Sequence, residues 1–251
     1  MVNKKIVKYI QSLTHKKFRD EEGAFIAEGP KIVGEFLLSE KLNCKIICAD
    51  KLWLSANESL LKNVNPGNIY EADDHWLQSM SHLKTANKVV AVFDKKITPG
   101  LPDISNKISL MLDDLQDPGN LGTLIRIADW FAVENIICSE NSVDCYNPKV
   151  VQSTMGSLLR VNVFYANLFS FIEKNDNLPV YATTLSGTSL FQLPGITSGI
   201  ILIGNESKGI HEDLLKLTSG QVTIPKFGQA ESLNAAVAGG IILSQIFRPL
   251  Q

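Results

Sequence analysis

Three segments beyond residue 110 place polar side chains directly after apolar runs. The segments LDDLQDPGNLGTLIR, ILIGNESKGI and IPKFGQAESLN supply Asn120, Arg126, Glu206, Ser232 and Asn234. Buried strands hold such loops rigidly at one edge of an open α/β sheet, where active sites of these folds are found. The pattern predicts a catalytic site made of loops from distant parts of the chain.

Common phosphate-binding and hydrolase motifs do not fit these segments. Gly204 and Gly209 have P-loop spacing, but Ile210 and His211 stand where that loop needs Lys and Ser or Thr. PGNLG cannot be aligned with GxGxxG, and the sequence has no GxSxG elbow and no HExxH pair. A nucleoside triphosphatase, a dinucleotide enzyme and a serine hydrolase are therefore disfavoured.

The same residues favour a site for a ligand with an apolar ring system. Glycines at 204 and 209 let the backbone approach a ligand closely, and Ile224, Pro225 and Leu233 supply an apolar wall. Arg126 has the planar donor group that binds a phosphate bidentately. Two plainer interpretations stay open: Arg126 forms a surface salt bridge, and Asn120 only caps a helix.

Alternating helix and strand patterns predict how these loops are positioned. In the first part, strands are predicted at 23–29, 44–50, 68–72 and 88–94, and helices near the N-terminus and at 30–42, 52–64 and 73–83. In the second part, strands are predicted at 108–115, 135–139, 161–166, 179–185, 199–205 and 221–225, and helices at 119–131, 147–159, 168–175, 211–217 and 232–247. Helical crossovers between strands imply a mostly parallel sheet covered on both faces.

Two domains follow from this pattern. Residues 1–95 form a small α/β domain, residues 96–107 a linker rich in proline, glycine and polar residues, and residues 108–251 the second domain. A chain of 251 residues is long enough for two hydrophobic cores.

Composition points to a soluble protein and gives only a weak hint of its partner. The net charge is −2, yet Lys4, Lys5, Lys8, Lys16, Lys17 and Arg19 crowd the first twenty residues. Such a helix is more often a solvated surface than a phosphate grip, so nucleic acid is indicated only weakly. The N-terminus has no continuous apolar core of a signal peptide, and no apolar run spans a bilayer, so we expect a cytoplasmic protein without membrane contact.

The four cysteines and four histidines do not form a metal-binding pattern. Cys44, Cys48, Cys138 and Cys145 match neither a CxxC pair nor a zinc ribbon, and no paired histidines lie near them. We expect reduced, mostly buried thiols and no metal.

Taken together and in this order, DPGNLGTLIR, LIGNESKGI and IPKFGQAESLN resemble the three motifs of the SpoU/TrmH family of SPOUT-class RNA ribose 2'-O-methyltransferases. The resemblance covers residues 108 to 250. The first domain looks like the substrate-binding domain often fused ahead of it. A trefoil-knotted α/β fold, which is an exception to the rule that chains do not thread loops, a homodimer and an S-adenosyl-L-methionine cofactor are implied.

The resemblance also implies roles for single residues. Asn120 and Arg126 match the N-x-G-x-x-x-R of the first motif, Glu206 the acidic residue of the second, and Ser232 and Asn234 the SLN of the third. These five are the expected catalytic residues. The cofactor would bind among three loops, after residue 185, at Gly204 and from Ile224 to Leu233. The expected cofactor-binding residues are Thr184, Leu185, Gly204, Asn205, Gly209, Ile224, Pro225 and Leu233.

The chain departs from the family pattern at one position. Where the third motif commonly continues SLNVS, this sequence has Ala236, which lacks a hydroxyl group. Thr154 and Gly156 fit a small-residue helix that the family places near its dimer interface, although close helix packing explains them as well.

The function predicted on this basis is S-adenosylmethionine-dependent methylation of a ribose 2'-hydroxyl in structured rRNA or tRNA. The alternative is a non-catalytic RNA-binding dimer with a degenerate methyltransferase domain. A methyltransferase for small molecules or proteins is a third possibility, which the basic N-terminus and the separate first domain disfavour.

Overall fold

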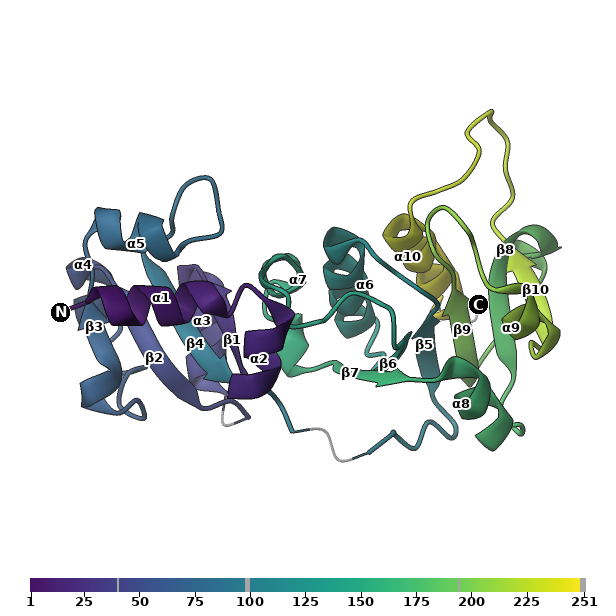
Figure 1. Ribbon diagram of the computed structural model, residues 1–251. Helices are drawn as coiled ribbons and strands as arrows, with labels where there is room; N and C mark the ends of the chain where they lie inside the picture. Colours follow the sequence, from purple (N-terminus) through teal and green to yellow (C-terminus); the bar gives the residue numbers. More distant parts are fainter. Residues whose placement is uncertain (40, 98–99, 194, 249–251) are drawn as a thin grey trace. The chain divides into compact units, whose positions relative to one another are not determined.

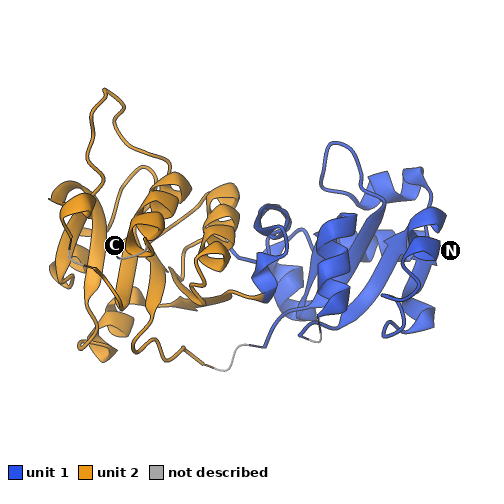
Figure 2. Ribbon diagram, turned by 180° about the vertical axis from the view of Figure 1, so that it is seen from behind, with its two compact units in different colours: residues 1–97, 144–159 blue, residues 98–143, 160–251 orange. Residues whose placement is uncertain are grey.

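The computed structural model describes residues 1–39, 41–97, 100–193 and 195–248. Thr98 and Pro99 of the predicted linker lie outside the described residues, as do residues 249–251 of the predicted second domain. Packing divides the chain into two compact units, Met1–Ile97 with Asp144–Leu159, and Thr98–Val143 with Arg160–Gln251 (Figure 2).

The first unit is a four-stranded mixed sheet with helices (Figure 1). Its strands run in the order β1-β4-β2-β3, with β4 antiparallel to β1 and β2, and β2 parallel to β3. The elements are α1 Lys4–Ser12, α2 Lys16–Glu22, β1 Ala24–Glu28, α3 Pro30–Leu38, β2 Cys44–Ala49, α4 Lys51–Ala56, β3 Ile69–Glu71, α5 Asp74–Met80, β4 Val89–Asp94 and α7 Pro148–Thr154, with 3₁₀ turns at Pro66–Asn68 and Ser157–Leu159.

Local sequence signals explain where these helices begin. Asn3 caps α1 by accepting hydrogen bonds from the backbone N–H groups of Lys5 and Ile6, and Asp73 caps α5 in the same way through Trp76. One apolar stripe of α1, including Ile6 and Ile10, packs into the core under the sheet.

A buried ion pair fastens residues 144–159 into the first unit. The guanidinium of Arg19, only 2% exposed, donates to Asp144 Oδ2 from Nε at 2.9 Å and from Nη2 at 2.7 Å. Its Nη1 donates to the carbonyl oxygens of Leu13 and Thr14. Arg19 is therefore a structural residue and does not belong to an exposed basic surface. Close packing also explains Thr154, which is fully buried.

The second unit is built on six parallel strands in the order β10-β8-β9-β5-β6-β7. The predicted α/β class and parallel sheet are confirmed. The elements are β5 Ile108–Leu112, α6 Pro118–Trp130, β6 Asn135–Ser139, β7 Asn162–Ala166, α8 Leu168–Lys174, β8 Val180–Ser189, β9 Gly199–Ile203, α9 Glu212–Lys216, β10 Gly220–Thr223 and α10 Ala235–Ile246, with a 3₁₀ turn at Leu190–Gln192.

Successive side chains of the central strands point to opposite faces of the sheet, and each face packs against its own helices. Leu202 of β9 belongs to the core that includes residues of α8 and α9. Its neighbour Ile203 faces the other way, toward the crossing of α6 and α10, where a Cβ on Gly239 would meet Leu124 Cδ2 at 2.5 Å and Ile203 Cδ1 at 3.2 Å. The two helices approach this closely because Gly239 has no side chain.

The order of the strands predicts a crevice at the carboxyl ends of β5 and β9. From β5 the chain continues to β6 on one side, and from β9 it continues to β10 on the other. In open parallel sheets, ligands bind at the carboxyl ends of two neighbouring strands from which the chain continues to opposite sides of the sheet. The trefoil knot, a property of the chain path and not of the strand order, stays a prediction.

Two element boundaries differ from the sequence prediction near this crevice. Helix α10 begins at Ala235 and not at Ser232, because the Asn234 side chain accepts hydrogen bonds from the N–H groups of Ala236 and Val237 and caps the helix there. Strand β8 extends to Ser189. The predicted strand ends at residue 185; in the structure the pairing with β10 jumps from Ala182 to Thr188, so that residues 183–187 bulge out of the ladder.

Candidate active site

Three of the predicted catalytic residues meet in one hydrogen-bonded chain within the second unit. Asn120 Nδ2 donates to Glu206 Oε1 at 2.7 Å, and Asn120 Oδ1 accepts from Asn234 Nδ2 at 2.8 Å. Asn120 lies in the first turn of α6 after β5, Glu206 follows β9, and Asn234 precedes α10. The network therefore fixes the amide orientation of Asn120 and ties the three motif segments together at the crevice between β5 and β9.

Asn120 is available for this role because another residue caps its helix. Asp117 Oδ1 accepts from the backbone N–H of Asn120 at 2.8 Å, and Pro118 occupies the first turn, where no N–H is needed. The interpretation that Asn120 only caps α6 is thus wrong. Its side chain is directed to Glu206 and Asn234 instead.

Glu206 stands on a tight turn that only glycine permits at its base. The N–H of Asn205 donates to the Gly209 carbonyl at 2.9 Å, and the Gly209 N–H returns to the Asn205 carbonyl at 3.0 Å. A Cβ on Gly204 would lie 2.3 Å from the Gly209 carbonyl carbon. Asn205 stiffens the turn further, since its Oδ1 accepts from the N–H groups of Ser207 and Lys208. These hydrogen bonds within the turn fix the backbone that carries Glu206.

Asn234 caps α10 without using a hydroxyl group at position 236. The Asn234 Oδ1 accepts from the Ala236 N–H at 3.0 Å, and its Nδ2 remains free to donate to Asn120. Ala236 itself is buried, and what it gives this network is its backbone N–H. The cap therefore needs no side-chain oxygen at that position.

Arg126 and Ser232 lie apart from this network. Arg126 is exposed on α6, on the side that also carries the exposed Thr123, and neither hydrogen bond nor ion pair reaches its guanidinium from any described residue. The alternative of a surface salt bridge finds no partner there. Ser232 is exposed on the segment before α10, and its hydroxyl likewise has no hydrogen bond within the described parts of the chain.

The predicted cofactor-binding residues surround the carboxyl ends of β10, β8 and β9, which are neighbours in the sheet. Thr184 and Leu185 lie on the bulge of β8, where Thr184 Oγ1 hydrogen-bonds the Ser186 carbonyl and the Leu185 carbonyl accepts from Thr223 Oγ1 at 3.2 Å. Gly204, Asn205 and Gly209 form the turn after β9. Ile224 and Pro225 are half-buried after β10, whereas Leu185 and Leu233 are exposed.

One further pair at this edge was missed by the sequence analysis. Asp113, directly after β5 and 3% exposed, accepts from the backbone N–H of His211 and contacts its ring Nδ1, both at 2.9 Å. The hydrogen bond to Asp113 raises the pKa of His211 above its ordinary value. The pair anchors the far end of the turn that carries Glu206. Only the position of Asp113 at the end of an apolar run signalled it.

Within the described residues, no three His, Cys, Asp or Glu side chains gather in a way that could hold a metal ion. No helix among them is both long enough and apolar enough to cross a bilayer.

Comparison with known proteins gives this fold and site a family. The model of the SpoU rRNA Methylase family matches residues 107–244, and the model of the MRM3-like substrate binding domain matches residues 3–91. The chain therefore belongs to the SpoU rRNA methylase family and is an enzyme of that family.

Individual relatives match over nearly the full chain. The 23S rRNA (guanosine(2553)-2'-O)-methyltransferase RlmP of Bacillus subtilis is 30% identical over 243 residues, which are 94% of each protein. The AdoMet-bound rRNA methyltransferase of Sinorhizobium meliloti superposes with a TM-score of 0.86 at 30% identity, covering 99% of this chain and 96% of the other. A TrmH-family structure from Porphyromonas gingivalis has a TM-score of 0.84 at 32% identity and 99% coverage of both.

Proposed function

We propose that this chain transfers a methyl group from S-adenosyl-L-methionine to a ribose 2'-hydroxyl of 23S ribosomal RNA in the cytoplasm. The observation that carries the proposal is the Asn120, Glu206 and Asn234 network, which joins all three family motifs at the crevice of a parallel sheet. The likeness to RlmP over 94% of both proteins supports 23S rRNA over tRNA. A degenerate, non-catalytic domain is disfavoured because Asn120, Glu206 and Asn234 are all present and hydrogen-bonded to one another.

The residues at the strand ends fit the cofactor. Leu185 and Leu233 offer exposed apolar side chains for an adenine ring, and the tight turn at Gly204 and Gly209 leaves backbone groups within reach of its edges. We propose that Thr184, Leu185, Gly204, Asn205, Gly209, Ile224, Pro225 and Leu233 hold it. When bound, S-adenosylmethionine supplies an electrophilic methyl group on a sulfonium.

Arg126 is proposed to hold the RNA. Its exposed guanidinium has no partner among the described residues, so it is free to bind a phosphate bidentately beside the target ribose. A guanidinium with a pKa above about 12 is a poor base, so we assign Arg126 to positioning and to stabilising charge on the attacking oxygen. The 2'-hydroxyl proton leaves to solvent as the oxygen accepts the methyl group.

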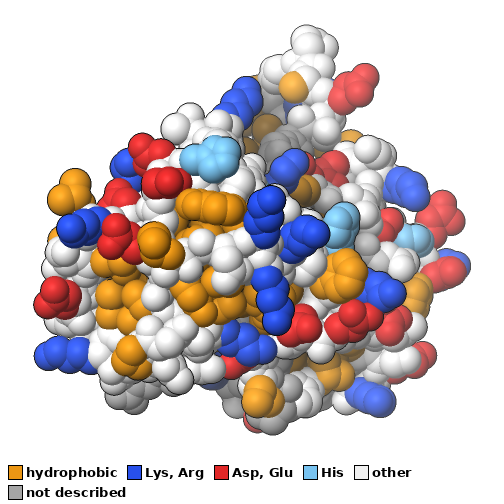
Figure 3. All heavy atoms as spheres, turned by 60° about the vertical axis from the view of Figure 1, so that its left-hand side comes forward, with side chains coloured by type: hydrophobic (Ala, Val, Ile, Leu, Met, Phe, Trp, Pro, Cys, Tyr) orange, Lys and Arg blue, Asp and Glu red, His pale blue; other side chains and the backbone are white. Residues whose placement is uncertain are grey.

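The first unit is proposed to contribute nonspecific RNA affinity through α1. Its lysines Lys4, Lys5 and Lys8 are exposed and make no ion pair with any described acid, whereas Lys16 and Lys17 of α2 pair with Asp20 and Glu21. Figure 3 shows a face on which basic side chains stand beside exposed hydrophobic ones. Each lysine that neutralises a phosphate releases counterions from the RNA, and Lys4, Lys5 and Lys8 can do so without first breaking an ion pair.

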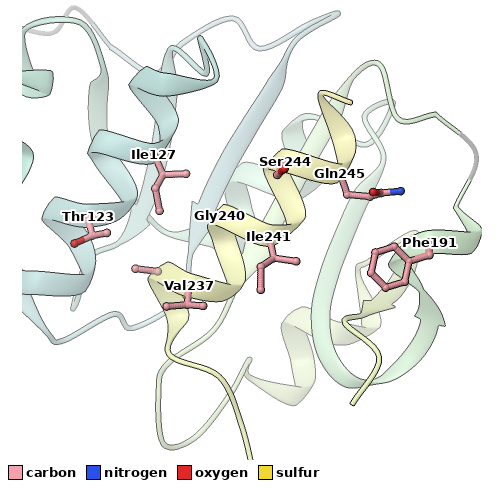
Figure 4. A pocket seen from close by; sticks show the side chains of 9 residues that line it. Thr123, Ile127, Phe191, Val237, Gly240, Ile241, Ser244 and Gln245 are labelled. Atoms are coloured by element: carbon pink, nitrogen blue, oxygen red, sulfur yellow. The ribbon is translucent and has the colours of Figure 1, made fainter. Parts of the chain in front are cut away.

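A homodimer is proposed through α6 and α10. A shallow groove of about 470 Å³ between these helices is lined by uncharged side chains that include Thr123, Ile127, Val237 and Ile241 (Figure 4). Trp130, at the end of α6, is 84% exposed. A second copy of the chain would cover this apolar surface. Light scattering of the wild type should then give twice the mass of one chain. The Ile241→Asp variant, which places a charge in the groove, should give the mass of one chain. A wild-type monomer would contradict this part of the proposal.

The catalytic proposal is tested with radiolabelled S-adenosylmethionine and ribosomal RNA from a strain that lacks the gene. We expect label at one ribose 2'-oxygen of 23S rRNA, located by mapping ribose methylation, and about 10²–10³-fold slower labelling with Arg126→Ala. RNA from the parent strain, already methylated, is the matched control. If the wild-type enzyme labels no ribose in any structured RNA, the proposed activity is wrong.

A further inference from the structure

Residues 224–234, between β10 and α10, form a long loop without helix or strand that projects from the second unit (Figure 1). Every residue from Lys226 to Asn234 is exposed, and no hydrogen bond from a described residue holds residues 226–233. Phe227 is 94% exposed. Burial of a Phe side chain is favourable, so a partner that covers this exposed ring gains binding free energy.

Both ends of this loop are fastened beside the proposed active site. At the start, Thr223 Oγ1 donates to the Leu185 carbonyl at 3.2 Å, and at the end Asn234 Nδ2 donates to Asn120 Oδ1 at 2.8 Å. Both ends of the loop that carries Phe227 are therefore tied to segments of the proposed site, while residues 226–233 make no hydrogen bond with the described parts of the chain.

The chemistry of the tip favours RNA as that partner. Lys226 precedes Phe227, Gly228 and Gln229 follow it, and the first acidic residue after them is Glu231. A cation next to an aromatic ring suits a nucleotide, whose phosphate attracts the ammonium while its base stacks on the ring. Other surfaces are already assigned to the remaining partners, since the exposed Leu185 and Leu233 are proposed to hold the cofactor and the α6–α10 groove is the proposed dimer surface.

We propose that Phe227 is a stacking platform for an unpaired base of the substrate RNA beside the methylated nucleotide, with Lys226 contacting the adjoining phosphate. This inference rests on the proposed function and adds a specific substrate-binding residue to it. Stacking is sequence-tolerant because every base has a π face. The platform thus selects unpaired RNA and not a particular base.

Fluorescence of Phe227→Trp tests where this side chain lies. The signal is corrected by titrating wild-type protein, which contains Trp53, Trp76 and Trp130. Added unmethylated 23S rRNA fragment should quench the new tryptophan, and S-adenosylmethionine alone should leave it unchanged. Quenching or a blue shift with cofactor alone, or with increasing protein concentration alone, would overturn the proposal in favour of a cofactor lid or a dimer contact.

Kinetics of Phe227→Ala separate this inference from the proposed function. We expect KM for RNA to rise about tenfold, the equivalent of roughly 1.4 kcal/mol of lost stacking, with cofactor affinity unchanged and with recovery in Phe227→Tyr. Phe169→Ala, which removes a less exposed ring from α8, is the matched control and should keep the wild-type KM. An active wild type with an unchanged KM in Phe227→Ala refutes the platform, whereas an inactive wild type refutes the proposed function itself.

Discussion

Two arginines, one in each unit, show how this chain separates structure from chemistry. Arg19 is buried in the first unit, binds Asp144 through two nitrogens and satisfies two backbone carbonyls with a third. Arg126 is exposed on α6 of the second unit, and no described residue pairs with it. All three guanidinium nitrogens of Arg19 donate to the protein, so this residue stabilises the fold. Arg126 donates to no described residue, so its guanidinium is available to a substrate.

The largest effect is expected from breaking the buried pair. Arg19→Ala leaves the Asp144 carboxylate buried without its cation, which should lower the free energy of unfolding of the first unit by about 3–5 kcal/mol. Urea unfolding measures this, and Lys17→Ala, which removes only a surface pair, should change it by less than about 1 kcal/mol. The double variant Arg19→Met with Asp144→Leu should recover much of the loss. A small effect of Arg19→Ala would show that the pair is not structural.

Removing Arg126 should spare the fold and impair the reaction. Arg126→Ala deletes a proposed donor to phosphate and developing charge, so kcat/KM should fall about 10²–10³-fold. The free energy of unfolding should change by no more than about 0.5 kcal/mol, as for other surface positions. Near-normal turnover of Arg126→Lys at saturating RNA would contradict a bidentate role, because an ammonium cannot reproduce the planar fork.

The hydrogen-bonded network lies between these extremes, since it is part-buried and also proposed to act in the site. Asn120→Ala removes the shared partner of the Glu206 carboxylate and the Asn234 amide, which are both exposed and can be hydrated, so the expected cost is about 0.5–1.5 kcal/mol. Unlike Arg126→Ala, it should weaken both folding and cofactor binding. Calorimetry measures the affinity for S-adenosylmethionine, and urea unfolding measures the free energy of unfolding. If only one of these two quantities changes, the network does not contribute to both folding and cofactor binding.

The smallest expected effect concerns His211 and pH. Its pKa is raised by Asp113, so the pair stabilises the fold fully below the unfolded-state pKa near 6.5 and loses that contribution as pH rises through the higher folded-state pKa. His211→Ala should therefore cost more stability at about pH 5.5 than at about pH 9. The ring is mostly exposed, so the difference should stay below about 1 kcal/mol. Unfolding curves at both pH values, with His75→Ala as control, measure it; an equal loss at both would refute the coupling.

Local patterns in the sequence were sufficient for most elements and for the motif residues. Apolar runs and polar residues at strand ends predicted the alternating layout and the meeting of Asn120, Glu206 and Asn234. These signals are local, and the parallel sheet then brings their ends together.

Features set by packing over long distances in the sequence were not predicted. The pairing of Arg19 with Asp144 joins residues 125 positions apart, and neither residue carries a local mark of burial. The same holds for Asp113 with His211 and for the bulge of β8, which depends on its pairing with β10. The Asn234 cap is a local signal, but the sequence prediction starts α10 two residues earlier, at Ser232.

Residues 144–159 pack in the first unit although the chain has by then already supplied β5, α6 and β6 to the second. During synthesis, the first ninety-seven residues would therefore leave the ribosome without Asp144 to neutralise Arg19 and without helix α7. Domains usually fold in order from the N-terminus, but here the first unit cannot be completed until residue 159 is available. The two units are consequently not interchangeable cassettes, because exchanging either one would require cutting the chain at three places.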